Sequence, residues 1–157
     1  MWERLQNPVL DAMGREVLFM IVHNIVANKD RLFKFNMSQS PHCPTCGVVQ
    51  DNVHLFCECL GVREAWFWVR QRLLGMLPPG GGTTSNFEFL HLMFDSGTLD
   101  SEIVWLLGMH VLQVWHKVVC KKKHLRINSV IAEIAQEYRV HHISNKPPLA
   151  HITGLLQ

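Results

Sequence analysis

Four cysteines and a histidine in one short stretch of the chain could bind a metal ion. Cys43 and Cys46 are separated by two residues, His54 follows after seven more, and Cys57 and Cys59 come next. Structural zinc is held by four thiolate or imidazole groups at the corners of a tetrahedron. A C-x2-C pair supplies two of these groups from a single turn, so the stretch predicts a closed structural zinc site.

The spacing alone leaves the fourth ligand open. His54 and Cys57 are three residues apart and would share one face of a regular helix. His54 and Cys59 are five residues apart, so both could reach one ion if the helix between them begins irregularly. His42 is a weaker candidate.

Two other roles for these cysteines are less favoured. Core thiols in a reducing compartment would be scattered, whereas four of the five cysteines fall between residues 43 and 59. Disulfides would need an oxidising compartment, and the N-terminus shows no secretory signal. We therefore expect an intracellular protein, in the nucleus or the cytoplasm, with Cys120 as a separate buried thiol.

A longer run of residues around the cysteines carries a family resemblance. It consists of Asn24, Arg31-Leu32-Phe33, Cys43-Pro44-Thr45-Cys46-Gly47, Asp51-Asn52-Val53-His54-Leu55-Phe56-Cys57-Glu58-Cys59 and Trp66. This run resembles the zinc-binding region that follows the polymerase core in the reverse transcriptases of non-LTR retrotransposons. The family's pattern is C-x2-C, a short polar loop, H-x4-C and then a tryptophan.

The resemblance covers roughly residues 15–75 and continues more loosely through residues 105–119. It implies that the zinc ligands are Cys43, Cys46, His54 and Cys59, with Cys57 as a bystander. It also implies that the working partner in the parent protein is template RNA or target DNA.

Apolar residues recur at helical spacing along most of the chain. We expect helices over residues 11–26, 60–77, 86–94, 101–122 and 127–141, and no confident strand. The predicted fold class is therefore mainly α: a small helical zinc-binding module, with the CCHC knuckle between helices, plus a second helical segment.

The run of Pro and Gly residues after position 77 cannot continue a helix, so it predicts a linker. We expect a helical zinc-binding module over residues 1–77, the linker over 78–85, a second helical segment over 86–142 and a flexible tail over 143–157.

Composition fits a folded chain. Of its 157 residues 48% are hydrophobic, and the formal net charge is +2. These values are typical neither of a disordered protein nor of a basic nucleic-acid-binding tail. The basic surplus is uneven, because residues 121–157 hold six Lys and Arg against two acidic residues.

The most hydrophobic window, residues 103–119, approaches the length that spans a membrane. It contains His110, Gln113, His116 and Lys117, whose polar groups would be costly in lipid. We therefore expect a helix buried inside the protein, and no membrane as a partner.

Two sets of basic residues are candidates for contacts with a nucleic acid. One set lies on the polar face of the helix after the cysteines, and the other ends the long apolar helix. They are Arg63, Arg70, Arg72, Lys121, Lys122 and Lys123. Basic helix faces can follow a phosphate backbone. A solvated face would also explain the arginines, and stabilisation of the helix dipole would also explain the lysines.

No catalytic arrangement is recognisable in the sequence. It lacks the adjacent aspartates that hold metal ions in a polymerase, a P-loop and an H-E-x-x-H motif. A zinc ion with four protein ligands also has no open position for a substrate. We therefore expect no enzymatic activity from this chain on its own.

These observations predict a non-catalytic structural zinc-binding module. As the resemblance implies, it would be derived from, or similar to, the C-terminal region of a retrotransposon reverse transcriptase and would contact RNA or DNA. The alternative is a zinc-stabilised protein-interaction module that docks a protein partner on the apolar helix 101–122. A transposon relic without a selected function is a third interpretation.

Overall fold

The computed structural model describes residues 5–77, 84–93, 101–123 and 125–143. The linker residues 78–83 and all of the predicted tail except Ile143 lie outside them. The helical elements are α2 (Ala12–Val22), α3 (Lys29–Lys34), η1 (His54–Glu58), α4 (Arg63–Met76), α5 (Asn86–Leu90), α6 (Ser101–Gln113), η2 (Val114–Cys120) and α7 (Ile127–Ile143).

The predicted fold class, mainly α with the cysteine–histidine knuckle between helices, is confirmed. Within the described ranges, β pairing is limited to one isolated antiparallel bridge between His42 and Val49. The expected helix over residues 60–77 begins only at Arg63, because the chain first makes the separate wide turn η1. The expected long helix over 101–122 is formed by α6 and η2 together.

Side chains at the helix starts explain where several elements begin. Asp11 accepts a hydrogen bond from the Gly14 N–H at 2.6 Å and caps α2. Ser85 caps α5 in a reciprocal capping box with Glu88. The Ser85 N–H donates to the Glu88 carboxylate, and this bond lowers the pKa of Glu88. Each cap satisfies an N–H group that has no partner within its own helix.

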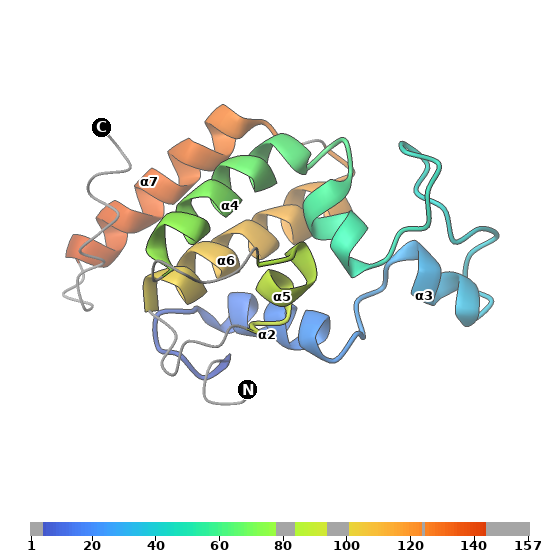
Figure 1. The fold of residues 1–157 in the computed structure, drawn as a ribbon, viewed down its shortest axis with the longest axis horizontal. Coiled ribbons are helices and arrows are strands. Elements are labelled where there is room, and N and C mark those ends of the chain that lie inside the picture. Colours follow the sequence, from blue (N-terminus) through green and yellow to red (C-terminus); the bar gives the residue numbers. More distant parts are fainter. Residues whose placement is uncertain (1–4, 78–83, 94–100, 124, 144–157) are drawn as a thin grey trace.

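α6 lies at the centre of the helical body. It packs against α2 on one side and against α4 and α7 on the other (Figure 1). Residues on several of its faces, such as Trp105, Leu106 and Val111, are buried. A helix that is apolar all round must be covered all round. The buried side chains before and after the linker consequently form a single hydrophobic cluster, while the domain boundaries stay a prediction.

By length and composition alone, Ser101–Cys120 could cross a membrane, but 56% of its apolar window is buried inside the protein. A core helix of a soluble protein passes the same test, and the packing of α6 fits that interpretation. Cys120, which we expected to be buried, is exposed. The helix ends there, so its last turn is not covered.

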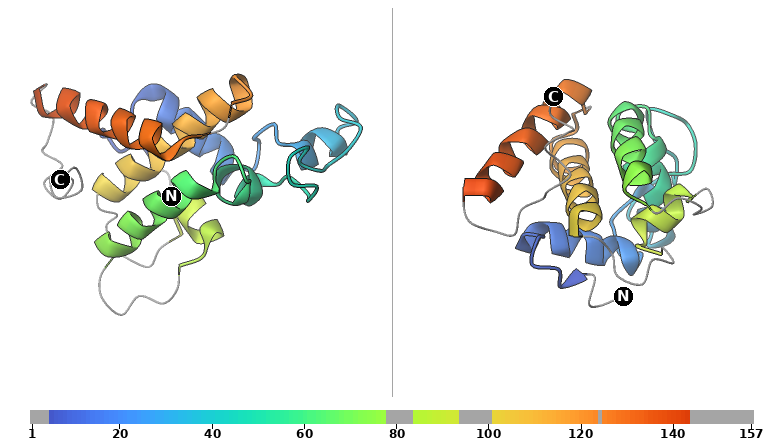
Figure 2. Two further views of the ribbon diagram at one scale, coloured as in Figure 1. Left: turned by 90° about the horizontal axis from the view of Figure 1, so that it is seen from above. Right: turned by 60° about the vertical axis from the view of Figure 1, so that its left-hand side comes forward.

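The segment that carries the C-x2-C pair projects from the helical body. We call residues 28–53, which include α3, the arm; two views show it to one side of the other helices (Figures 1 and 2). The arm returns to the body at η1. The predicted knuckle therefore lies where the arm and the body meet.

Candidate metal centre

Cys43, Cys46, His54 and Cys59 form a cluster in which one ligand atom from each residue lies within 4.8 Å of the others. The Sγ atom of Cys59 is 3.8 Å from the Sγ atoms of both Cys43 and Cys46. Cys43, His54 and Cys59 are buried, and Cys46 is partly exposed. The four residues are those that the family resemblance implies.

A tight turn in the arm presents Cys43 and Cys46. The Gly47 N–H donates to the Cys43 carbonyl at 2.9 Å, and the Cys43 N–H donates to the Val48 carbonyl at 2.7 Å. Gly47 has a φ of 73°, which glycine adopts without a steric cost. The turn folds the second cysteine back toward the first.

The wide turn η1 brings His54 and Cys59 together. The Cys59 N–H donates to the His54 carbonyl at 2.8 Å, a bond that spans five residues and not the four of a regular helix. The His54 N–H donates to Asp51 Oδ1 at 2.8 Å and fixes the start of the turn. Two ligands five residues apart can therefore face the same point.

Cys57 and His42, the other candidates for the fourth ligand, lie outside the cluster. Cys57 is buried, and burial raises the pKa of its thiol. It lines a separate open hollow beside Trp66 and Arg70. The His42 ring lies 3.0 Å from the Ser40 hydroxyl. Neither side chain is positioned to share an ion with the other three ligands.

The two closest buried thiols respond differently to their surroundings. Burial acts to raise the pKa of Cys43, but the His54 imidazole and the backbone amides of Thr45 and Cys46 outweigh it and lower that pKa to about 6. Burial, together with the charge of Cys43, raises the pKa of Cys59 to about 12. Two thiolates this close repel each other, and a cation between them would remove the repulsion.

The donor set and its geometry fit a tetrahedral metal ion and are compatible with zinc. Two sulfurs bound at about 2.3 Å to a tetrahedral zinc ion lie about 3.8 Å apart, which is the separation found here for two of the sulfur pairs. Among the residues that the structure describes, the buried Nε2 atom of His54 has no hydrogen-bond partner. Buried polar atoms normally have one, and a metal ion would satisfy this nitrogen.

A second buried histidine contacts η1, the turn that contains His54. The sequence did not single out this histidine as functional. His110 on α6 lies with its Nε2 atom 2.7 Å from the Phe56 carbonyl in η1. Its ring lies 5.0 Å from that of Trp66, which in turn packs against Phe89. The only signal in the sequence was a polar residue within an otherwise apolar helix.

The structure does not gather the six basic candidates into one surface. Arg63 and Arg70 line the hollow that contains Cys57, and Arg70 donates to the Thr84 carbonyl at 3.0 Å. Arg72 lies over the Trp68 ring at 4.1 Å, and that ring is half-buried. These contacts give Arg70 and Arg72 a partner within the chain. The role of all three arginines toward a nucleic acid stays a prediction.

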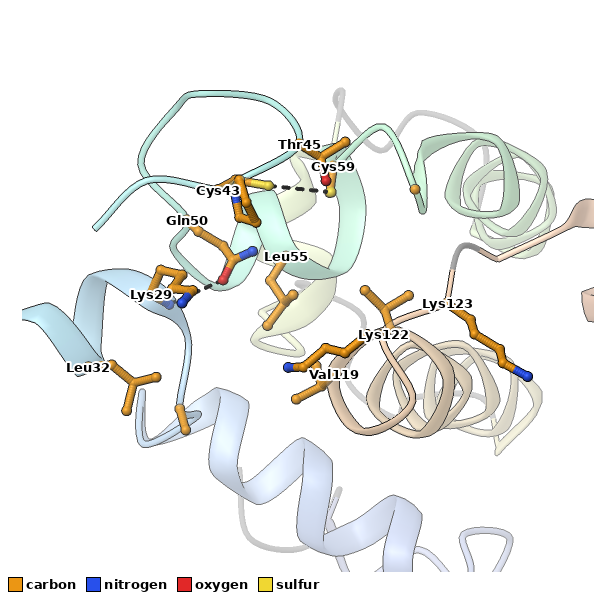
Figure 3. Close-up of a pocket in the computed structure, with 14 residues that line it drawn as sticks. Lys29, Leu32, Cys43, Thr45, Gln50, Leu55, Cys59, Val119, Lys122 and Lys123 are labelled. Carbon is orange, nitrogen blue, oxygen red and sulfur yellow. Dashed lines mark hydrogen bonds between the residues drawn. The ribbon is translucent and has the colours of Figure 1, made fainter. Parts of the chain in front are cut away.

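The lysines at the end of η2 lie elsewhere, beside the metal cluster. Lys122 and Lys123 line a cleft that also includes Cys43, Cys59 and, from the arm, Lys29 (Figure 3). Lys121 is exposed and does not line the cleft. Arg63 and Arg70 therefore line one hollow, and Lys122 and Lys123 line another.

Comparison with known proteins adds no relative: no family model, curated protein or solved structure matches the chain.

Proposed function

We propose that this chain is a non-catalytic structural zinc-binding module whose Cys3His centre fastens the arm to the helical body. The observation that carries the proposal is the cluster of three sulfurs and one imidazole within 4.8 Å of one another, in which two sulfur pairs lie 3.8 Å apart. Cys43 and Cys46 come from the arm, and His54 and Cys59 from η1 and its end. A structural zinc ion contributes about 10–16 kcal/mol in small domains, which is comparable to the whole stability of a typical domain.

We also propose that the module contacts RNA or DNA in a reducing compartment, the nucleus or the cytoplasm. The resemblance to the region after the polymerase core of retrotransposon reverse transcriptases supports this, as do the lysines beside the cluster. The chain would be a fragment of such an element or a repurposed copy. Docking of a protein on residues 101–122 has less support, because α6 is covered within the chain.

Native mass spectrometry of the intact chain tests the metal part of this proposal. The protein should carry the mass of one zinc ion under native conditions and lose it on denaturation. A native mass without metal, from protein purified with zinc present, would contradict the proposal.

A titration with nucleic acid at low salt tests the second part. Binding through phosphates releases counterions, so affinity should fall steeply as salt rises. Affinity that does not change with salt would count against phosphate contacts. Self-association in the absence of nucleic acid, lost on substitution of Trp105 or Trp115 by a polar residue, would favour the protein-docking alternative.

A further inference from the structure

A cleft of about 310 Å³ lies between α3, the knuckle and the end of η2 (Figure 3). Lys29 and Leu32 line it from the arm, and Val119 and Lys122 line it from the end of η2. Ligand pockets in proteins range from about 300 to 1,000 Å³. The cleft is thus large enough for one small chemical group with its immediate neighbours.

The charge of the cleft is positive, because its lysines outnumber the one net negative charge of a zinc ion held by three thiolates and a neutral imidazole. Of the described part of the chain, three lysines and no Asp or Glu line the cleft. Among the described residues none of the three forms an ion pair. Lys122 extends its amine into the space between α3 and η2, and Lys123 points away from that space (Figure 3). Lys29 and Lys122 therefore line one cavity from two separate elements, and the charges of both would attract an anion bound there.

The backbone holds the lysine segment firmly beside the knuckle. The Leu125 N–H donates to the Gly61 carbonyl at 2.9 Å, and the Lys123 N–H donates to the Lys117 carbonyl at 2.8 Å. Lys122 has a φ of 55° at the position after a helix end that glycine usually occupies. A lysine at this position has a conformational cost that glycine would avoid. Unlike glycine, it provides a side chain, and this side chain enters the cleft.

The walls of the cleft combine polar and apolar surface. Thr45 and Gln50 add polar groups, while Leu32, Leu55 and Val119 give an apolar surface. An apolar wall suits a sugar or an unstacked base next to the phosphate. In a duplex the bases are stacked inside, so a single strand fits this combination better.

We propose that this cleft binds a phosphate of single-stranded RNA or DNA, held between Lys29 and Lys122. The inference rests on the proposed contact with nucleic acid and gives it a location. It assigns the contact to the space between the arm and η2, with one residue, Lys29, that the sequence did not indicate. The metal centre forms one wall, so zinc would shape the site without touching the strand.

The test uses the zinc-loaded full chain and a short fluorescently labelled single strand, as RNA and as DNA, measured by anisotropy over a range of salt. Lys29→Gln and Lys122→Gln should each weaken binding about tenfold. Each should also reduce the slope of log affinity against log salt by about 0.7. Lys121→Gln is the matched control, because it removes the same charge next to Lys122 but outside the cleft, and it should bind like the unmodified protein.

Several results would overturn the inference. If Lys29→Gln and Lys122→Gln bind normally, or Lys121→Gln weakens binding as much as they do, the cleft is not the site, although the proposed function stands. Equal affinity for a duplex of the same sequence would exclude single-strand recognition. If the two variants lose zinc and not affinity for the strand, the lysines serve the metal centre. No binding by the unmodified protein would remove the proposed nucleic-acid function together with the inference.

Discussion

His110 is fully buried in the middle of α6, where its imidazole lies against the Trp66 ring and its Nε2 atom contacts the Phe56 carbonyl. Burial lowers the pKa of this imidazole to about 4. The ring is therefore neutral near pH 7, and Nε2–H donates to the carbonyl. This bond joins the core helix to η1, the turn that carries one ligand and leads to another.

The buried imidazole predicts a pH dependence of stability. Below its ordinary pKa of 6.5, His110 takes up a proton in the unfolded chain but not in the folded chain until the pH reaches about 4. The contribution of neutral His110 is present above pH 6.5 and is lost as the pH falls toward 4, at about 1.4 kcal/mol per pH unit and about 3 kcal/mol in total.

Urea unfolding of the unmodified protein and of His110→Gln, measured from pH 7 to pH 4, checks this prediction. Glutamine keeps an N–H donor but does not titrate, so its stability should fall less steeply with acid. The metal ligands are the same in both proteins, and their effect cancels in the difference. Two stability curves that run parallel would show that His110 contributes nothing to the pH dependence.

The turn η1 bears on the choice of fourth ligand, which the spacing of the residues left open between Cys57 and Cys59. In a regular helix Cys57 would have shared a face with His54, but the bond from the Cys59 N–H to the His54 carbonyl closes a wider turn. That turn places Cys59 in the cluster and Cys57 in another hollow. Helical periodicity cannot predict such a local widening. The family pattern, in contrast, already contains the H-x4-C spacing of His54 and Cys59.

A buried pair of asparagines joins the two ends of the arm to each other, and one of them also contacts the body; these contacts were not predicted. Asn28 caps α3 by accepting from the Arg31 N–H at 2.8 Å, and its amide donates to Asn52 Oδ1 at 2.6 Å. Asn52 in turn donates to Asn24 Oδ1 at 3.2 Å. The partner of Asn28 is 24 residues away, so this contact depends on the tertiary fold and has no local signal in the sequence.

Asn52→Ala should lower the free energy of unfolding by about 2 kcal/mol, because it leaves the buried amide of Asn28 without its acceptor. Asn128→Ala is the control: Asn128 is exposed in α7, and its loss should change stability by less than about 0.5 kcal/mol. Chemical denaturation of both variants measures the difference. Equal stabilities would mean that the asparagine pair does not hold the arm.

The whole molecule divides into a helical body organised by α6 and an arm with little apolar packing of its own. α3 contains no buried residue, and Phe33, Phe35 and Met37 are exposed. The apolar period of the helices made the mainly α fold predictable. The projection of the arm, and the cleft between it and η2, could not be predicted because they depend on contacts between distant segments.

Removal of the metal should therefore act unevenly across the molecule. After chelation, amides of residues 42–61 should lose protection from hydrogen exchange, while α2 and α6 keep theirs through their mutual apolar packing. Hydrogen–deuterium exchange with and without chelator, followed by mass spectrometry, makes the comparison. Uniform loss of protection would indicate that the body depends on the metal as much as the arm does.

The central claim is that Cys43, Cys46, His54 and Cys59 hold one zinc ion. The metal content of two cysteine variants tests this claim most directly. Cys57 and Cys59 are both buried and lie two residues apart, but only Cys59 belongs to the cluster. Native and denatured masses should show one zinc ion on the unmodified protein and on Cys57→Ser, and none on Cys59→Ser. Zinc retained by Cys59→Ser and lost by Cys57→Ser would contradict the ligand set.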